Sequence, residues 1–295
     1  MQGYTYNGNT LVWTRDDGDP KDYLSVDNHQ TFALCNAKMI VFDKDGTLGD
    51  DKASLQRWAC HMTDRVEESI LCGSHRDRDP LLVQVLLTEF HSQIGWDPVR
   101  QTVLPSAPLS AGTWDDQVAT VQALLNKHQS NHSNNTGMLA KEWHSQVELH
   151  NADNPVIANL RGVLLDCRNH GLIISVCTSD ERQSTDEALE NWKVDDIISY
   201  SICGDEVDNP KPSAEPLERL CRHAGVSPHE CIVVGDTSSD MEMARNSKAL
   251  FCIGVLTGSG TAEQLTATGA NIVVPSVGHV PDLLSALGLM RNGTC

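Results

Sequence analysis

Two aspartates, Asp43 and Asp45, follow a short apolar run and stand directly before a glycine. The run 39–42 reads MIVF and predicts a buried strand, and Gly46 lets the chain turn away from it. Open parallel sheets bind ligands at the carboxyl ends of their strands, so two carboxylates placed there can converge on one point. One acid can then act as a nucleophile and the other as a proton donor and acceptor, with a divalent cation offsetting their repulsion. The alternative is an ordinary aspartate-rich turn after a strand.

Three later groups of polar residues are placed in a similar way. They are Thr178 and Ser179 after the apolar run 172–177, Lys211 between two prolines, and Asp236 with Asp240 after the apolar run 231–235. The prolines prevent the loop of Lys211 from becoming helix. Together the four groups supply a nucleophile, carboxylates for a metal, a cation and hydroxyl donors, which are the parts that phosphoryl transfer requires.

This set of motifs and its order resemble the phosphatase branch of the haloacid dehalogenase superfamily. The resemblance covers roughly residues 38–50 and 156–290. It implies that Asp43 attacks phosphorus to form an aspartyl phosphate, and that Asp45 protonates the leaving oxygen and later deprotonates water. Mg²⁺ would be bound by Asp43, the backbone carbonyl of Asp45, Asp236 and Asp240, the last directly or through water. Lys211, Thr178 and Ser179 would bind phosphate oxygens.

Each of these residues also has a structural interpretation. Thr178 and Ser179 could cap a helix over 180–190, since Ser and Thr are common at that position. Lys211 could be a solvated loop lysine, and Asp240 could complement the dipole of a helix N-terminus. We expect Lys44 to point away from the metal, and a role in substrate binding is not favoured for it.

Composition sets the class of protein. The 295 residues are 40% hydrophobic and 21% charged, which is typical of a globular chain with a large core. The formal net charge of −18 argues against nucleic acid or an anionic membrane as partner, because both require basic patches. The ten cysteines include no CxxC pair and are expected to be reduced thiols, many of them buried. No signal peptide or membrane-spanning stretch is recognised, so we expect a cytoplasmic protein.

The spacing of apolar residues changes between the first and second motifs. Over 51–154 they recur every three to four positions, which predicts a helical insertion. Under the resemblance this insertion is a cap that closes over the site and contacts the part of the substrate that is not phosphate. Trp96 and Arg100 are candidate specificity residues in it, although Trp96 could instead belong to the cap core and Arg100 be a surface charge.

The remaining pattern alternates strands and helices, which predicts an α/β core with a Rossmann-like parallel sheet covered by helices on both faces. The predicted domains are an N-terminal extension of unknown role at 1–36, the core at 37–50 and 155–290, and the helical cap at 51–154. The predicted elements are strands near 38–42, 172–177, 197–201, 231–235 and 249–253, and helices near 156–169, 183–191, 213–224 and 239–246, with a last helix beginning at Ala262. The resemblance also places the first strand centrally, between the second and the fourth.

These observations predict a Mg²⁺-dependent phosphatase that hydrolyses a small phosphomonoester metabolite of the phosphoglycolate or sugar phosphate type. A sugar phosphomutase of the same superfamily is the alternative with related chemistry, because Asp45 suits both reactions. A non-catalytic metabolite-binding or regulatory protein on the same fold is the alternative of another class. The sequence does not distinguish between oligomeric states.

Overall fold

The computed structural model describes residues 3–6, 10–14, 22–25, 34–71, 80–104, 107–111, 114–128, 140–143 and 155–289. The chain forms two compact units. One contains Met1–Asp50 and Pro155–Cys295, and the other contains Asp51–Asn154.

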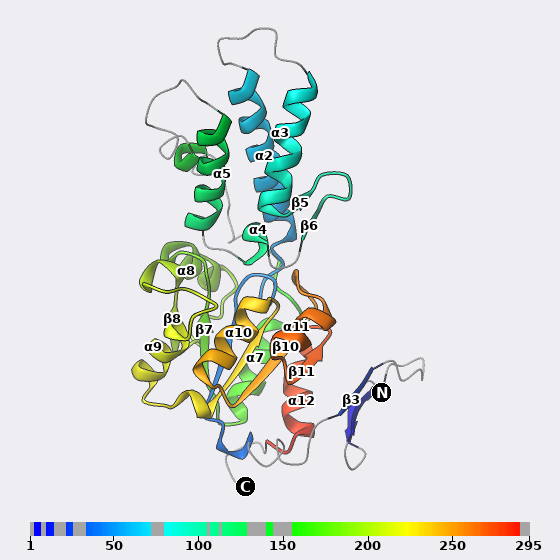
Figure 1. Ribbon diagram of the computed structural model, residues 1–295. Helices are drawn as coiled ribbons and strands as arrows, with labels where there is room; N and C mark the ends of the chain where they lie inside the picture. Colours follow the sequence, from blue (N-terminus) through cyan, green and yellow to red (C-terminus); the bar gives the residue numbers. More distant parts are fainter. Residues whose placement is uncertain are drawn as a thin grey trace. The chain divides into compact units, whose positions relative to one another are not determined.

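The first unit is built on a six-stranded sheet with the strand order β11-β10-β9-β4-β7-β8 (Figure 1). Its strands are β4 (Met39–Phe42), β7 (Ile173–Cys177), β8 (Tyr200–Ile202), β9 (Cys231–Gly235), β10 (Phe251–Val255) and β11 (Ile272–Val274). All paired strands run parallel. The prediction of an α/β parallel sheet is therefore confirmed, with β4 between β7 and β9. This order brings the C-terminal ends of three motif-bearing strands side by side.

The side chains of β4 are apolar on both faces of the sheet, so helices can cover both faces. Ile40 and Phe42 belong to one apolar cluster, and Met39 and Val41 belong to the other. All four side chains are fully buried, as expected for a strand of a parallel sheet with helices on both sides. The strand has no polar side chain until it ends, so Asp43 is the first residue able to do chemistry.

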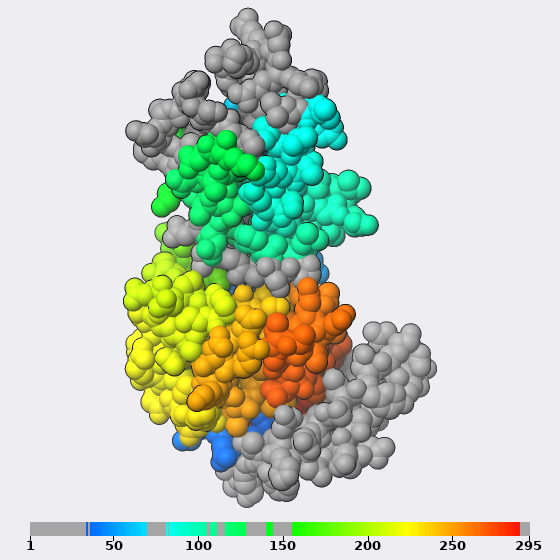
Figure 2. All heavy atoms as spheres, viewed as in Figure 1, coloured from blue at the N-terminus to red at the C-terminus, as the bar shows by residue number. Residues whose placement is uncertain are grey.

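Two sets of helices cover the two faces. Residues of α7 (Leu160–Asn169) and α12 (Val280–Ala286) pack in the cluster that contains Phe42. Residues of α9 (Glu215–Ala224), α10 (Ser238–Ser247) and α11 (Ala262–Thr268) pack in the cluster that contains Val41. In the space-filling view, the yellow and orange side chains of this second set form the visible surface over the sheet (Figure 2).

Most predicted core elements are confirmed, and the differences lie near the edges of the sheet. Helix α8 (Arg182–Asn191) follows β7 as predicted. The strand predicted at 197–201 begins only at Tyr200, because 195–197 form a turn that buries Ile197. The sequence prediction omitted β11, whose three residues are too few for a clear pattern, and it also omitted α12, so α11 is not the last helix.

The second unit is mainly helical. Its elements are α2 (Lys52–Leu71), α3 (Pro80–Ile94), the short strands β5 (Trp96–Asp97) and β6 (Thr102–Val103), α4 (Pro108–Ala111) and α5 (Trp114–His128). Buried side chains from α2, α3 and α5 form a separate core that includes Trp58, Phe90 and Val121. Strands β5 and β6 pair antiparallel and join α3 to α4.

The N-terminal segment contains a second sheet. Its strands β1 (Gly3–Tyr6), β2 (Thr10–Thr14) and β3 (Asp22–Ser25) pair antiparallel in the order β1-β2-β3 and do not extend the six-stranded sheet. No function follows from this arrangement.

None of the described helices is long and apolar enough to cross a membrane. Seven of the cysteines are described as free thiols, and all of these but Cys60 are buried. This agrees with the expectation of reduced, mostly buried cysteines.

Helix α9 offers a clean test of the backbone. It ends at Gly225, which has φ +67°, and a β-carbon at this position would have no atom within 4 Å. Gly225→Ala should therefore destabilise the protein through the left-handed conformation alone, by about 1 kcal/mol. Gly225→Asn should cost less, since Asn tolerates this region. Urea unfolding of the three proteins measures both values, and an alanine variant as stable as the wild type would contradict this account.

Candidate active site

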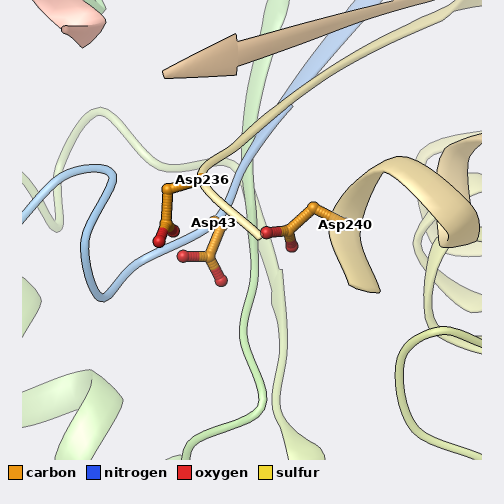
Figure 3. A group of neighbouring side chains, drawn as sticks. All are labelled: Asp43, Asp236 and Asp240. Carbon is orange, nitrogen blue, oxygen red and sulfur yellow. The ribbon is translucent and has the colours of Figure 1, made fainter. Parts of the chain in front are cut away.

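Three carboxylates meet at the C-terminal edge of the sheet. Asp43 follows β4, Asp236 follows β9, and Asp240 lies in the first turn of α10. One oxygen of each lies within 4.8 Å of the others, and the side chains point toward one another in Figure 3. The oxygens belong to one small cluster because β4 and β9 are neighbours in register, with Phe42 opposite Val234.

Glycines make room for these carboxylates. A β-carbon on Gly46 would lie 2.7 Å from Asp236 Oδ2, and one on Gly258 would lie 1.8 Å from the same atom. A β-carbon on Gly235 would lie 2.4 Å from Cγ of Asp240. Gly46 also has φ +80°, which lets the chain turn directly after Asp45. The acidic cluster therefore depends on positions where no side chain fits.

Lys211 supplies the positive charge of the cluster. Its Nζ donates to Asp43 Oδ1 at 2.7 Å and to Asp240 Oδ1 at 2.6 Å. Its side chain is only 3% exposed, so the interpretation as a solvated loop lysine is wrong. Burial lowers the pKa of Lys211, but the charges of Asp240 and Asp43 raise it well above its usual value, so the side chain is cationic.

Asp236 and Asp240 are held by donors from their surroundings. Asp236 accepts hydrogen bonds from Thr47 Oγ1 at 3.2 Å and from the backbone N–H of Ser259 at 3.0 Å. Asp240 Oδ2 accepts from the backbone N–H of Thr237 at 3.0 Å and from its hydroxyl at 2.7 Å. Thr237 Oγ1 in turn accepts the backbone N–H of Asp240 at 3.3 Å, and this bond together with the one from the Thr237 N–H forms a capping box at the start of α10. The helix-terminus interpretation of Asp240 is thus correct, and it is compatible with a place in the acidic cluster.

Asp45 lies on the same loop as Asp43 but has a different partner. Lys44 Nζ contacts its two carboxylate oxygens at 2.8 and 2.7 Å and also contacts Asp180 Oδ2 at 2.8 Å. Lys44 is completely buried, whereas the side chain of Asp45 is 26% exposed. Burial raises the pKa of Asp45, although the charge of Lys44 opposes this shift.

The hydroxyl residues lie at the end of the neighbouring strand. Thr178 and Ser179 follow β7, which pairs with β4. Thr178 Oγ1 accepts the backbone N–H of Asp180 at 3.1 Å. The expectation that these residues cap the next helix is wrong, because α8 begins after Glu181, which occupies the N-cap position. Their role in phosphate binding stays a prediction.

The charge of Asp43 is unfavourable in the absence of a cation bound to the cluster. Burial raises the pKa of its carboxyl from 3.8 to about 7, with Lys211 lowering it and the charges of Asp240 and Asp45 adding to the increase. Three converging carboxylates provide the hard oxygen ligands that Mg²⁺ and Ca²⁺ prefer. The donor set therefore fits a divalent cation, which would neutralise the charges that Lys211 leaves uncompensated.

The two candidate specificity residues belong to the helical unit. Trp96 is 4% exposed and packs in the core of that unit. Arg100 is largely exposed, and its guanidinium donates to Asp97 at 2.8 Å. Both interactions match the structural interpretations given above, while their role in specificity stays a prediction.

Sequence reasoning missed several residues that support the site. Thr47 and Ser259 bind Asp236, and Thr257 Oγ1 donates to the carbonyl of Gly46 at 2.6 Å. Thr47 stands beside the recognised motif, and the loop 256–260 follows a predicted strand. Polar residues in the loops that follow neighbouring strands could therefore have been considered as candidates for the site.

The chain is similar in sequence and in fold to known proteins. Residues 116–253 match the haloacid dehalogenase-like hydrolase family. A phosphoglycolate phosphatase of Salmonella typhi is 25% identical over 273 residues, which cover 88% of this chain and 96% of the relative. Among solved structures, a predicted phosphoglycolate phosphatase of Haemophilus somnus has a TM-score of 0.60 at 16% identity, covering 84% of this chain and 98% of that one. A candidate β-phosphoglucomutase of Thermotoga maritima has a TM-score of 0.53 at 18% identity, with coverages of 84% and 98%.

The raised pKa of Asp43 predicts how stability depends on pH when metal is chelated. Between pH 3.8 and about 7 the folded protein keeps a proton that the unfolded chain has released. Raising the pH through this window therefore favours unfolding. In EDTA, the melting temperature of the wild type should fall relative to that of Asp43→Asn, by at least about 3 °C, which corresponds to about 1 kcal/mol.

Asp208→Asn is the matched control, since the side chain of Asp208 is 90% exposed. Its melting temperature should follow that of the wild type at every pH. Parallel curves for the wild type and Asp43→Asn would show that Asp43 does not carry this pH dependence.

Proposed function

Because its sequence and the comparisons identify this chain as a haloacid dehalogenase-like hydrolase, we propose that it is a Mg²⁺-dependent phosphatase acting through an aspartyl phosphate. The substrate class is a small phosphomonoester, either of the phosphoglycolate type or a sugar phosphate. One observation carries the proposal: the Asp43, Asp236 and Asp240 carboxylates converge within 4.8 Å, and Lys211 binds two of them.

In the first step, a carboxylate oxygen of Asp43 attacks phosphorus as the ester P–O bond breaks. Asp45 gives its proton to the departing alkoxide. Lys211 and the donors at Thr178 and Ser179 bind the equatorial oxygens, where negative charge is spread in the transition state. When bound, Mg²⁺ supplies further stabilisation of this charge. The products of the step are the free alcohol and a phosphoryl group on Asp43.

In the second step, Asp45 is a carboxylate and takes a proton from water. The water oxygen attacks phosphorus, the bond between Asp43 and phosphorus breaks, and inorganic phosphate is released. Asp45 thus ends the cycle protonated, ready for the next ester. Its partial exposure is consistent with access to both an alcohol and a water molecule.

The helical unit at 51–154 is proposed to act as a cap. In this role it excludes water during the first step and contacts the part of the substrate that is not phosphate. Support comes from its position in the sequence between Asp43 and Thr178, and from its separate core.

A panel of phosphorylated metabolites, assayed for inorganic phosphate with Mg²⁺ and with EDTA, tests the proposal. Stoichiometric phosphate release that requires Mg²⁺ is the expected result, with Ca²⁺ supporting little turnover because its coordination is looser. Transfer of phosphate within a sugar, dependent on a bisphosphate primer, would instead identify a mutase. Tight binding of a metabolite without turnover would identify a binding protein.

Replacing the nucleophile gives the sharpest prediction. Asp43→Asn should reduce turnover of every ester by a factor of about 10⁴ or more, because the amide is similar in size but cannot form an acyl phosphate. The variant should remain folded, as measured by circular dichroism. Asp208→Asn is again the control and should retain full activity. Substantial phosphate release by highly purified Asp43→Asn would mean that another group attacks phosphorus.

Arg100 offers a test of the cap. It is exposed, so Arg100→Ala should leave the fold intact. We expect KM for the best metabolite to rise about tenfold and KM for p-nitrophenyl phosphate to stay unchanged. Arg65→Ala, at a partly exposed pair with Glu68 in the same unit, is the control. Equal effects of Arg100→Ala on both substrates would exclude a role in specificity. Trp96→Phe tests the other candidate in the same assay with less disturbance of the core than alanine.

A further inference from the structure

One buried cation plays no part in the proposed reaction. Lys44 lies between the two aspartates of the first motif in the sequence, yet it contacts only the second of them in the structure. Its side chain has no exposed surface, and its Nζ lies 2.7 Å from Asp45 Oδ2 and 2.8 Å from Asp180 Oδ2. A lysine is rarely buried so completely unless it is paired.

The two ion pairs of Lys44 differ in how firmly the carboxylate is held. Asp180 is 5% exposed in its side chain. Its Oδ1 accepts the backbone N–H of Glu181 at 2.8 Å, and its Oδ2 also accepts the hydroxyl of Ser184 at 2.8 Å. Its own backbone is fixed as well, because its carbonyl accepts the N–H of Gly204 at 2.8 Å. Asp180 is therefore a fixed anchor for Lys44, located just before α8.

Asp45, in contrast, is held through Lys44. Both carboxylate oxygens of Asp45 lie within 2.8 Å of Lys44 Nζ, and the side chain is partly exposed. A single ammonium that contacts both oxygens restricts rotation of the carboxylate. The chain of contacts thus runs from α8 through Asp180 and Lys44 to the group proposed to move protons.

We propose that Lys44, anchored by Asp180, is a positioning residue that holds the Asp45 carboxylate in place for proton transfer. The inference rests on the proposed function, in which Asp45 serves as acid and then as base. Lys44 itself contacts neither phosphate nor nucleophile in this assignment. Its effect on the reaction must pass through Asp45, and this restriction makes the proposal testable.

Two substrates with different leaving groups can distinguish the loss of Asp45 positioning from a general loss of structure. When an alkyl phosphate such as glycerol phosphate reacts, its alcohol departs as an unstable alkoxide and needs a proton from Asp45. The p-nitrophenolate ion is stable without that proton. The ratio kcat/KM reports only the steps up to formation of the aspartyl phosphate, so it isolates this difference from the later hydrolysis, in which Asp45 acts on water for both substrates.

The variants are Lys44→Met, which removes the charge, and Asp180→Asn, which weakens the anchor. Lys44→Met should lower kcat/KM for the alkyl ester by about 10- to 100-fold and for p-nitrophenyl phosphate by less than about threefold. It should lower kcat for both. Asp180→Asn should show the same pattern at smaller size. Lys38→Met is the control, because Lys38 directly precedes β4, the strand that leads to Lys44, and pairs at the surface with Glu230.

A double-mutant cycle tests the route of the effect. In an Asp45→Asn background, Lys44→Met should cause no further loss of kcat/KM, because the group on which Lys44 acts is absent. An additional loss there, or an equal loss for both leaving groups in the single variant, would overturn the proposal and assign Lys44 a general structural role.

A second readout does not depend on turnover, so it separates this proposal from the proposed function. Crystal structures of the wild type and of Lys44→Met should show the Asp45 carboxylate in different places, with Asp43 unmoved. An Asp45 that keeps its place without Lys44 would overturn positioning, whatever the activity. A wild type that releases no phosphate from any ester would overturn the proposed function while leaving the structural comparison valid. If Lys44→Met does not fold, Asp180→Asn gives the comparison instead, because it weakens the anchor of Lys44 while keeping the lysine.

Discussion

Repulsion among carboxylates is the constraint on which the site depends. Two unit charges about 5 Å apart repel by about 3 kcal/mol at the effective dielectric of a protein site, and three such groups meet here within 4.8 Å. Lys211 offsets part of this repulsion through Asp43 and Asp240, and hydrogen-bond donors around Asp236 offset more. Burial, together with the repulsion that remains, raises the pKa of Asp43 and makes a site for a divalent cation favourable.

The fold makes this arrangement possible because helices bury the strands on both faces and the polar residues follow the strands at one edge of the sheet. Strand β4 has apolar side chains on both faces, so it is held rigidly by two layers of helices. Its position between β7 and β9 brings polar residues far apart in the sequence to one edge. Glycines at 46, 235 and 258 then allow the carboxylates to approach. The packed sheet holds the backbone of the site in place, and the glycines leave the space in which the carboxylates meet.

The sequence predicted the site residues that follow apolar runs, but not the contacts that are made through loops. Asp43 and Asp236 stand directly after apolar runs, with Asp240 four residues further on, so their convergence followed from the rules of parallel sheets. Lys211 was recognised instead from its place between two prolines in the order of the motifs. Lys44 gave no such signal. The alternation of side chains along a strand predicts on which side Lys44 lies, but it does not identify its partner Asp180, which is 136 positions away. The support from Thr47 and Ser259 was missed for a similar reason. These contacts depend on the paths of loops, which hydrophobic patterns do not encode.

The central claim is that Asp43 becomes phosphorylated during turnover. Rapid quenching of the working enzyme, followed by borohydride reduction and peptide mass spectrometry, measures it directly, since an acyl phosphate is reduced to an alcohol whereas a free carboxylate is not. The account predicts that the peptide containing Asp43 carries homoserine at this position, in an amount that depends on both substrate and Mg²⁺. An unmodified Asp43 under conditions of full turnover, or reduction at another acidic residue, would contradict it.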